Sequence, residues 1–83
     1  MNDEGSDIVG LCISSSKLIK FLEFKGYRFI RTKGTSHNIY GNGYLSVPIP
    51  IHGKKDIGED LIRQILRETS ISKNELLEWL GRK

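Results

Sequence analysis

The sequence predicts an α+β fold in which helices pack on one face of a three-stranded antiparallel sheet. Apolar residues recur at helical spacing near residue 20 and again after residue 60. Between these regions lie three short segments rich in strand-forming residues, separated by glycine-containing turns. Because the chain has 83 residues, we expect these elements to form one domain with one thin core.

The first helix is expected to begin at Ser14 or Ser15, because either hydroxyl can accept a hydrogen bond from a free amide of the first turn. The apolar residues that follow have helical spacing: Leu18, Ile19 and Leu22. Gly26 is a natural stop, since glycine readily adopts the left-handed conformation that ends many helices.

Three strands are expected next, at Tyr27–Lys33, Ser36–Tyr40 and Tyr44–Ile49. Gly41-Asn42-Gly43 predicts a tight turn between the last two, because such turns need residues that tolerate positive φ. Ile30 breaks the alternation of apolar and basic residues in the first strand. In the third strand, one side is expected to carry Leu45, Val47 and Ile49, and the other Tyr44 and Ser46. Pro48 and Pro50 lack an amide proton, so this strand should lie or end at a sheet edge.

Two helices are expected after a linking loop at residues 53–58. The second helix is marked by Leu61, Ile62, Ile65 and Leu66, with Glu59 and Asp60 in its first turn and Arg67 near its end. Ser72 and Glu75 have the spacing of a capping box, and a short third helix follows with Leu76, Leu77 and Leu80. The order α-β-β-β-α-α matches that of double-stranded RNA-binding domains and leaves one sheet face open to a ligand.

Residues 1–13 are expected to form a loose acidic tail, and the ordered domain is expected to span residues 14–83. The tail carries three acids and no basic residue, so it resembles no secretory signal. No stretch approaches the roughly 20 apolar residues of a membrane span. Cys12 is the only cysteine, which excludes a disulfide framework and a cysteine-based zinc site. These features favour a reducing, cytoplasmic setting.

The positive charge of the chain is concentrated in the predicted domain. All 13 Lys and Arg residues lie from Lys17 onward, against seven of the 10 acidic residues, so this part of the chain carries a formal charge of +6. A compact body with this excess attracts polyanions such as RNA. The simpler interpretation is that the charge keeps the protein soluble.

His37 is the strongest candidate for chemistry. It lies at the predicted start of the second strand, after the small residues Gly34-Thr35-Ser36, and close in sequence to Arg31 and Lys33. An exposed imidazole can exchange a proton with a ribose hydroxyl or a leaving oxygen at neutral pH, and nearby cations can hold the phosphate. The alternative is a surface histidine without a role. Ser36 is expected to point away from His37, because adjacent strand residues face opposite sides.

His52, Lys54 and Lys55 form a second candidate group. His52 can bind phosphate or act as a second acid, but a loop histidine that bonds a backbone carbonyl is the favoured interpretation. Lys54 and Lys55 can hold phosphate or lie in a solvated loop. Tyr40 and Tyr44 can stack on bases or pack at the sheet edge. The acids at residues 56, 59 and 60 are best explained by their place at a helix start, so we expect no metal site and no cofactor.

Three segments together resemble the HicA family of mRNA-interferase toxins. They are residues 13–22, the Gly34-Thr35-Ser36-His37 turn, and the run Val47-Pro48-Ile49-Pro50-Ile51-His52-Gly53, with residues 61–72 similar to the family's next helix and turn. The resemblance covers about residues 13–80. Each piece is a weak signal by itself, but together, in this order and at this length, they are fairly specific.

The resemblance implies a fold like the double-stranded RNA-binding domain, metal-independent cleavage of mRNA, and a HicB-like antitoxin that covers the active site. It makes His37 the catalytic residue and points to His52 as a further functional histidine. Arg31, Lys33, Ser36, Lys54 and Lys55 are then candidate RNA-binding residues. The chain departs from the family's Gly-Ser-His turn, because Thr35 is inserted or takes the place of a glycine that can adopt positive φ.

Two other functions remain open from the sequence. The same fold and basic face would suit a noncatalytic RNA-binding module. They would also suit a protein-interaction domain with an acidic partner. A noncatalytic RNA-binding module would bind labelled RNA without cutting it, whereas a nuclease would cut it. A protein-interaction domain would not arrest growth when it is expressed, whereas a toxin would.

Overall fold

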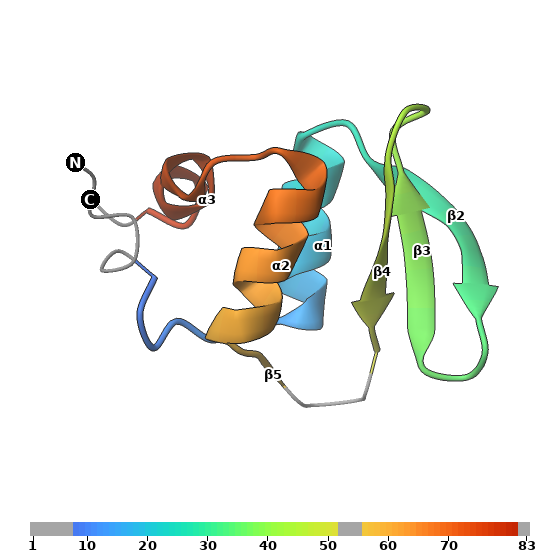
Figure 1. The fold of residues 1–83 in the computed structure, drawn as a ribbon, viewed down its shortest axis with the longest axis horizontal. Helices are drawn as coiled ribbons and strands as arrows, with labels where there is room; N and C mark the ends of the chain where they lie inside the picture. Colours follow the sequence, from blue (N-terminus) through green and yellow to red (C-terminus); the bar gives the residue numbers. More distant parts are fainter. Residues whose placement is uncertain (1–7, 52–55, 82–83) are drawn as a thin grey trace.

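The computed structural model describes residues 8–51 and 56–81, and its architecture is α+β. Its elements, in chain order, are β1 (Ile13–Ser14), α1 (Ser15–Phe24), β2 (Arg28–Lys33), β3 (His37–Gly41), β4 (Ser46–Pro50), β5 (Asp56–Ile57), α2 (Glu59–Thr69) and α3 (Lys73–Trp79). Figure 1 shows α1 and α2 between the sheet and α3. The predicted fold class is therefore confirmed, and the element order roughly matches that of a double-stranded RNA-binding domain, with the short strands β1 and β5 in addition.

The sheet is a three-stranded antiparallel meander in the order β2-β3-β4. β4 lies at an edge of the sheet, as its two prolines predict. Proline has no amide proton to donate, and on the outer side of an edge strand no neighbouring strand needs one. Asn42 shapes the turn between β3 and β4, since its side-chain oxygen accepts hydrogen bonds from the amides of Tyr44 and Leu45 at 2.9 and 2.8 Å.

Ile30 marks an irregularity in the edge strand β2, where the pairing with β3 shifts between Phe29 and Arg31. This bulge accounts for the broken alternation in the sequence. It lays the Ile30 side chain over Gly41, where an added Cβ would lie 2.5 Å from Ile30 Cδ1. Because Gly41 has no side chain, it leaves room for the Ile30 side chain of β2 to lie over the central strand β3.

Local capping explains where α1 and α3 begin. The Ser14 hydroxyl accepts a hydrogen bond of 3.1 Å from the amide of Lys17 at the start of α1. Before α3, Ser72 accepts from the amide of Glu75, whose carboxylate accepts in turn from the Ser72 amide, which completes the predicted capping box. α1 is followed by Gly26, which has a φ of +98°.

The main core lies between the sheet and the helices. Val47 and Ile49 of β4 are fully buried there, and both α1 and α2 contact this strand. The buried side chains that the helices contribute are Leu18, Phe21, Leu22, Ile62, Ile65, Leu66, Thr69 and Leu76. α3 packs through its partly buried Trp79, whose ring lies 5.5 Å from that of Phe21 between centroids. The core therefore extends through the helical layer to α3.

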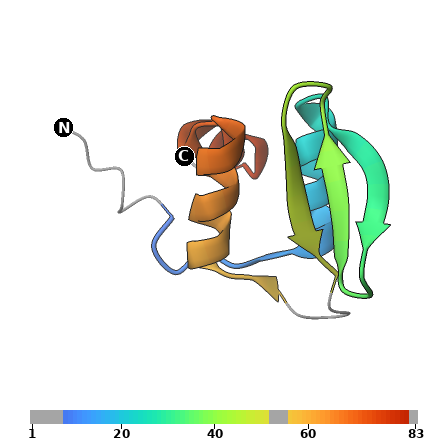
Figure 2. The same cartoon turned by 45° about the vertical axis from the view of Figure 1, so that its right-hand side comes forward.

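The described part of the N-terminal segment differs from the expected loose tail. Ile8, Leu11 and Ile13 are buried and belong to the core cluster. Ile13 also pairs with Ile57 in the short antiparallel ladder of β1 and β5, and Figure 2 shows these two segments running alongside each other next to the helices. The irregular spacing of these three apolar residues matches no helix or strand period, which is why the sequence pattern placed the start of the domain near Ser14.

Candidate functional site

The strand register assigns the side chains of β3 to two faces. Val47 and Ile49 point toward the helices, and their partners on β3 are Tyr40 and Asn38. Because neighbouring residues of a strand alternate, His37 and the other odd-numbered residues of β3 lie on the opposite side. We call this side, which faces away from the helices, the open face.

His37 is the first residue of the central strand, and it is half-buried on the open face. It lies between Lys33 on β2 and Pro50 on β4. The carbonyl of the preceding Ser36 accepts a 2.8 Å hydrogen bond from the Ile51 amide, and the Pro50 carbonyl accepts a 3.0 Å bond from the Ser15 hydroxyl. These bonds fix the backbone on both sides of the imidazole.

The Ser36 hydroxyl lies 3.2 Å from Nδ1 of His37. The prediction that the two side chains face opposite sides is wrong, because Ser36 belongs to the turn and not to the strand. The turn takes its positive φ of +64° at Gly34, so Thr35 does not need the left-handed conformation. Ser36 is thus in a position to orient the imidazole.

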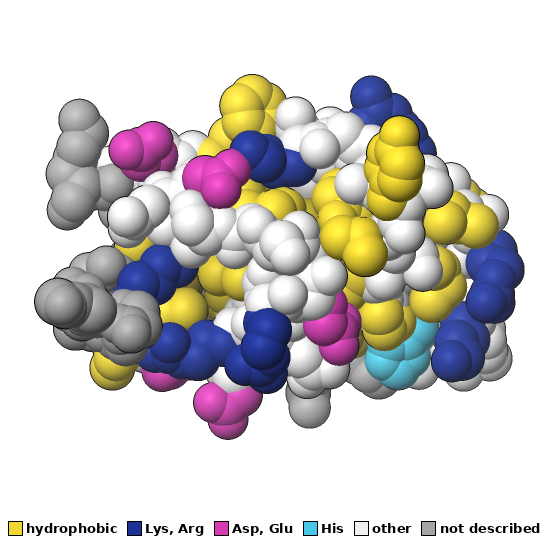
Figure 3. Space-filling view, turned by 45° about the horizontal axis from the view of Figure 1, so that its top comes forward, with side chains coloured by type: hydrophobic (Ala, Val, Ile, Leu, Met, Phe, Trp, Pro, Cys, Tyr) yellow, Lys and Arg dark blue, Asp and Glu magenta, His cyan; other side chains and the backbone are white. Residues whose placement is uncertain are grey.

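Arg31 and Lys33 lie on the open face beside His37. Lys33 is the register partner of His37, and Arg31 is the partner of Ile39, two residues further along β3. Both cations are exposed, and no ion pair of either is found within residues 8–51 and 56–81. Figure 3 shows the histidine at the molecular surface, with hydrophobic side chains on one side and Lys and Arg side chains close by. The fold therefore brings together three of the residues that the sequence singled out.

The sequence of the chain matches a known protein family. The sequence profile of the HicA toxin of bacterial toxin–antitoxin systems matches residues 15–71, which include the whole sheet and His37. The chain belongs to the HicA toxin family. HicA proteins are generally mRNA-cleaving toxins, and membership of the family implies an antitoxin partner. No curated protein and no solved structure matches the chain.

His52, Lys54 and Lys55 of this HicA chain lie outside the described residues. The residues on either side are described. The Ile51 amide donates a hydrogen bond to the Ser36 carbonyl, and Asp56 begins β5, which pairs with β1. His52 is thus covalently joined to a residue that is hydrogen-bonded to the turn before His37. The roles of the three residues stay predictions.

The open face of this HicA domain also has an apolar half that sequence patterns missed. Ile39 is only 8% exposed although it lies outside the main core cluster. Ile30 lies over neighbouring Gly41, and Pro48 is the register partner of Ile39 on β4. The break in alternation at Ile30 was the one available signal for this arrangement. A substrate at His37 would meet cations toward β2 and apolar side chains further along the sheet.

The sequence left open whether Tyr40 and Tyr44 stack on bases or pack at the sheet edge, and the structure places them in different environments. Tyr40 is buried on the helix side of the sheet, where its ring meets that of Phe29 edge to face at 5.9 Å, and burial raises the pKa of its hydroxyl. Tyr40 therefore packs in the core. Tyr44 is 93% exposed in the turn between β3 and β4, so its ring is accessible to a partner.

Of the acids that follow β4, Glu59 is engaged in structural contacts. Glu59 accepts hydrogen bonds from the Gly10 amide and from the Arg63 guanidinium, and these contacts lower the pKa of its carboxyl. Within the described ranges, no group of three His, Cys, Asp or Glu residues is arranged to hold a metal ion. Likewise, no helix in that part of the chain is long and apolar enough to cross a membrane.

Proposed function

We propose that this HicA toxin is an endoribonuclease that cleaves mRNA without a metal ion, with His37 as the catalytic residue. The observation that carries the proposal is the placement of a half-buried imidazole on the open face, between Lys33 and Pro50 and next to the Ser36 hydroxyl. A proton carrier held by a rigid strand beside exposed cations is suited to attack on a phosphodiester.

In the proposed reaction, the neutral His37 imidazole removes the proton of a ribose 2′-hydroxyl. The oxygen attacks the adjacent phosphorus, and the bond to the 5′-oxygen breaks as that oxygen gains a proton. The products are a 2′,3′-cyclic phosphate and a free 5′-hydroxyl. The negative charge that grows on the phosphoryl oxygens is stabilised by Arg31 and Lys33, which share a face with His37.

The other residues that the sequence singled out are assigned supporting roles in this proposal. Ser36 holds Nδ1 of His37 and so fixes the ring orientation. His52 is a candidate for the acid that protonates the leaving oxygen, because it follows Ile51, which is bonded to the turn before His37. Lys54 and Lys55 are candidates for contacts to flanking phosphates.

We further propose that a HicB-like antitoxin neutralises the toxin by covering the open face. Ile30 is 53% exposed there, and the exposed cations of β2 border it. The apolar side chains of such a partner would bury Ile30, and its acidic side chains would pair with the cations of β2. The bound partner would also exclude RNA from His37.

The decisive experiment compares the chain with its His37→Ala variant on labelled RNA in EDTA. We expect the unmodified protein to cut RNA to cyclic-phosphate products and the variant to lose cutting and growth arrest while keeping its circular dichroism spectrum. Replacing the 2′-hydroxyl at the scissile position by hydrogen should block cutting without preventing binding. Retained cleavage by the variant would exclude His37, and an intact but gel-shifted RNA with the unmodified protein would indicate a noncatalytic RNA-binding module.

A further inference from the structure

The open face continues beyond His37, toward the turn between β3 and β4. After His37, β3 places Ile39 and then Gly41 on this face. Their register partners on β4 are Pro48 and Ser46. At the usual rise of a strand, the distance from His37 to Gly41 is about 14 Å. The proposed chemistry uses only the end of the face that carries His37.

The rest of the open face combines an apolar surface with a charged margin. Its apolar half consists of Ile30, Ile39 and Pro48, of which Ile30 is 53% exposed. Arg31 and Lys33 lie along the β2 margin of the same face, and both are exposed. Neither forms an ion pair with another residue of the described ranges. Both cations are therefore available to a ligand that also covers the apolar half.

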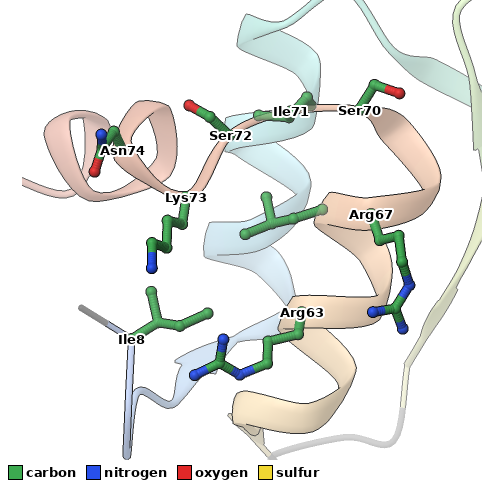
Figure 4. Close-up of a pocket in the computed structure, with 9 residues that line it drawn as sticks. Ile8, Arg63, Arg67, Ser70, Ile71, Ser72, Lys73 and Asn74 are labelled. Atoms are coloured by element: carbon green, nitrogen blue, oxygen red, sulfur yellow. The ribbon is translucent and has the colours of Figure 1, made fainter. Parts of the chain in front are cut away.

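The helical layer offers a second surface with cations, a hollow lined by Arg63, Arg67 and Lys73 (Figure 4). Arg63 is paired with Glu59, and Lys73 has an interaction of its own, so two of the three cations are already engaged. Figure 1 shows α3 and the N-terminal segment on the side of α1 and α2 that is away from the sheet. A strand of RNA that starts at His37 is therefore favoured to continue along the open face.

We propose that the apolar half binds the bases of a single-stranded RNA whose scissile phosphate lies at His37, an inference that rests on the proposed function. The phosphates follow Lys33 and Arg31, which advance along β2 in step with β3. Stacked nucleotides are about 3.4 Å apart, so the 14 Å of the face holds at most about four of them. A duplex keeps its base faces covered, so this subsite selects unpaired RNA.

Tyr44 extends the subsite at the far end of the face. It lies in the turn just beyond the register pair of Gly41 and Ser46, and its side chain is 93% exposed. The turn is held by Asn42, whose side-chain oxygen accepts a hydrogen bond from the Tyr44 amide. An aromatic ring in such a position can stack on a base of any identity. We assign Tyr44 to the nucleotide that leaves the apolar half.

Two features favour RNA over a protein segment as the occupant. The apolar half is continuous with the proposed catalytic histidine, so a bound substrate has to pass beside it. The positive charge is confined to one margin, which suits a phosphate backbone with its bases turned to the other side. An antitoxin that covers this surface would inhibit by displacing the RNA.

The test measures binding of 2′-O-methyl pentaadenylate and diadenylate by amide shifts. These strands lack the free hydroxyl that the proposed reaction needs, so the unmodified protein binds them without cutting. We expect the pentanucleotide to shift the amides of Lys33, Ile39 and Gly41, and the dinucleotide to shift chiefly that of Lys33. Replacing three bases of the pentanucleotide by abasic sites should weaken its binding about fivefold or more.

Ile30→Ala and Tyr44→Ala should each weaken binding of the pentanucleotide several-fold. They should affect the abasic strand much less, because the contact that they remove is to a base. The dependence of affinity on salt should keep its slope, since no phosphate contact is lost. Phe24→Ala is the matched control, because Phe24 is 69% exposed at the end of α1, on the other side of the sheet, and it should leave both affinities unchanged.

Equal losses for the normal and the abasic strand would overturn the proposal, since the two side chains would then not contact bases. Unchanged binding of pentaadenylate in both variants would also overturn it. If those variants bound a co-expressed antitoxin less tightly, the apolar half would serve the protein partner alone. Catalysis is judged separately: if strands with free hydroxyls bind in this way but are not cut, the proposed function fails and the base subsite stands.

Discussion

At the residue scale, the candidate site depends on how one imidazole is held. Position 37 starts a central strand, so its backbone is paired on both sides, and Ser36 adds a contact to the ring from the turn. Histidine function commonly depends on the bond at the second ring nitrogen, since that bond sets the tautomer and the ring orientation. We therefore propose Ser36 as a positioning residue for His37.

Replacing Ser36 with alanine should lower the cleavage rate while leaving RNA affinity nearly unchanged. One neutral hydrogen bond contributes about 0.5–1.5 kcal/mol, which corresponds to a rate loss of roughly two- to tenfold. Ser36→Thr keeps the hydroxyl and should restore most of the activity, and Thr35→Ala serves as a control in the same turn. The pH–rate profile should shift in Ser36→Ala alone. An unchanged rate and profile would mean that the contact does not orient the ring.

At the element scale, short-range signals predicted most of the structure. The helix starts followed from Ser14 and Ser72, because capping is decided by residues three positions apart. The edge position of β4 followed from its prolines. The placement of His37 at the start of a strand next to a tight turn was also predictable from neighbouring residues.

Features that depend on long-range contacts were not predictable in the same way. The pairing of β1 with β5 joins residues more than 40 positions apart in two-residue strands, which are too short to show a period. The approach of the Ile30 side chain to Gly41 combines a bulge in β2 with a glycine on β3, and these two positions are 11 residues apart in the sequence. Sequence alternation reports which face a residue occupies and gives no information on what covers that face.

The capping box of α3 provides a prediction at this scale. Ser72→Ala removes the side-chain acceptor for the Glu75 amide and should destabilise the domain by about 1 kcal/mol. α3 has only seven residues, so its first turn is a large part of the helix. Asn74→Ala, at an exposed site in the same helix, is the matched control and should be neutral or slightly stabilising. Urea unfolding of both variants measures the difference, and equal midpoints would show that the box does not stabilise the helix.

At the scale of the whole molecule, two carboxylates connect segments that are far apart in sequence. Glu59 at the start of α2 accepts from the Gly10 amide and so holds the N-terminal segment against the helices. Glu75 of α3 pairs with Lys25, which follows α1. These contacts tie the two ends of the described chain to the helical layer that supports the sheet.

The same two carboxylates should make stability depend on pH in the acid range. Hydrogen bonds from Gly10 and Arg63 lower the pKa of Glu59, and those from Lys25 and Ser72 lower the pKa of Glu75, each below the usual 4.5. A carboxyl with a lower pKa in the folded state contributes stability above its unfolded pKa and loses it as the pH falls through the folded value. We therefore expect thermal stability to be constant near neutrality and to decline below about pH 4.5, with a shallower decline in Glu59→Gln and Glu75→Gln. Glu78→Gln, at an exposed position of α3, removes the same charge and should keep the full decline. If stability declined equally in all three variants as the pH falls, the decline would reflect the net charge of the protein and not these two contacts.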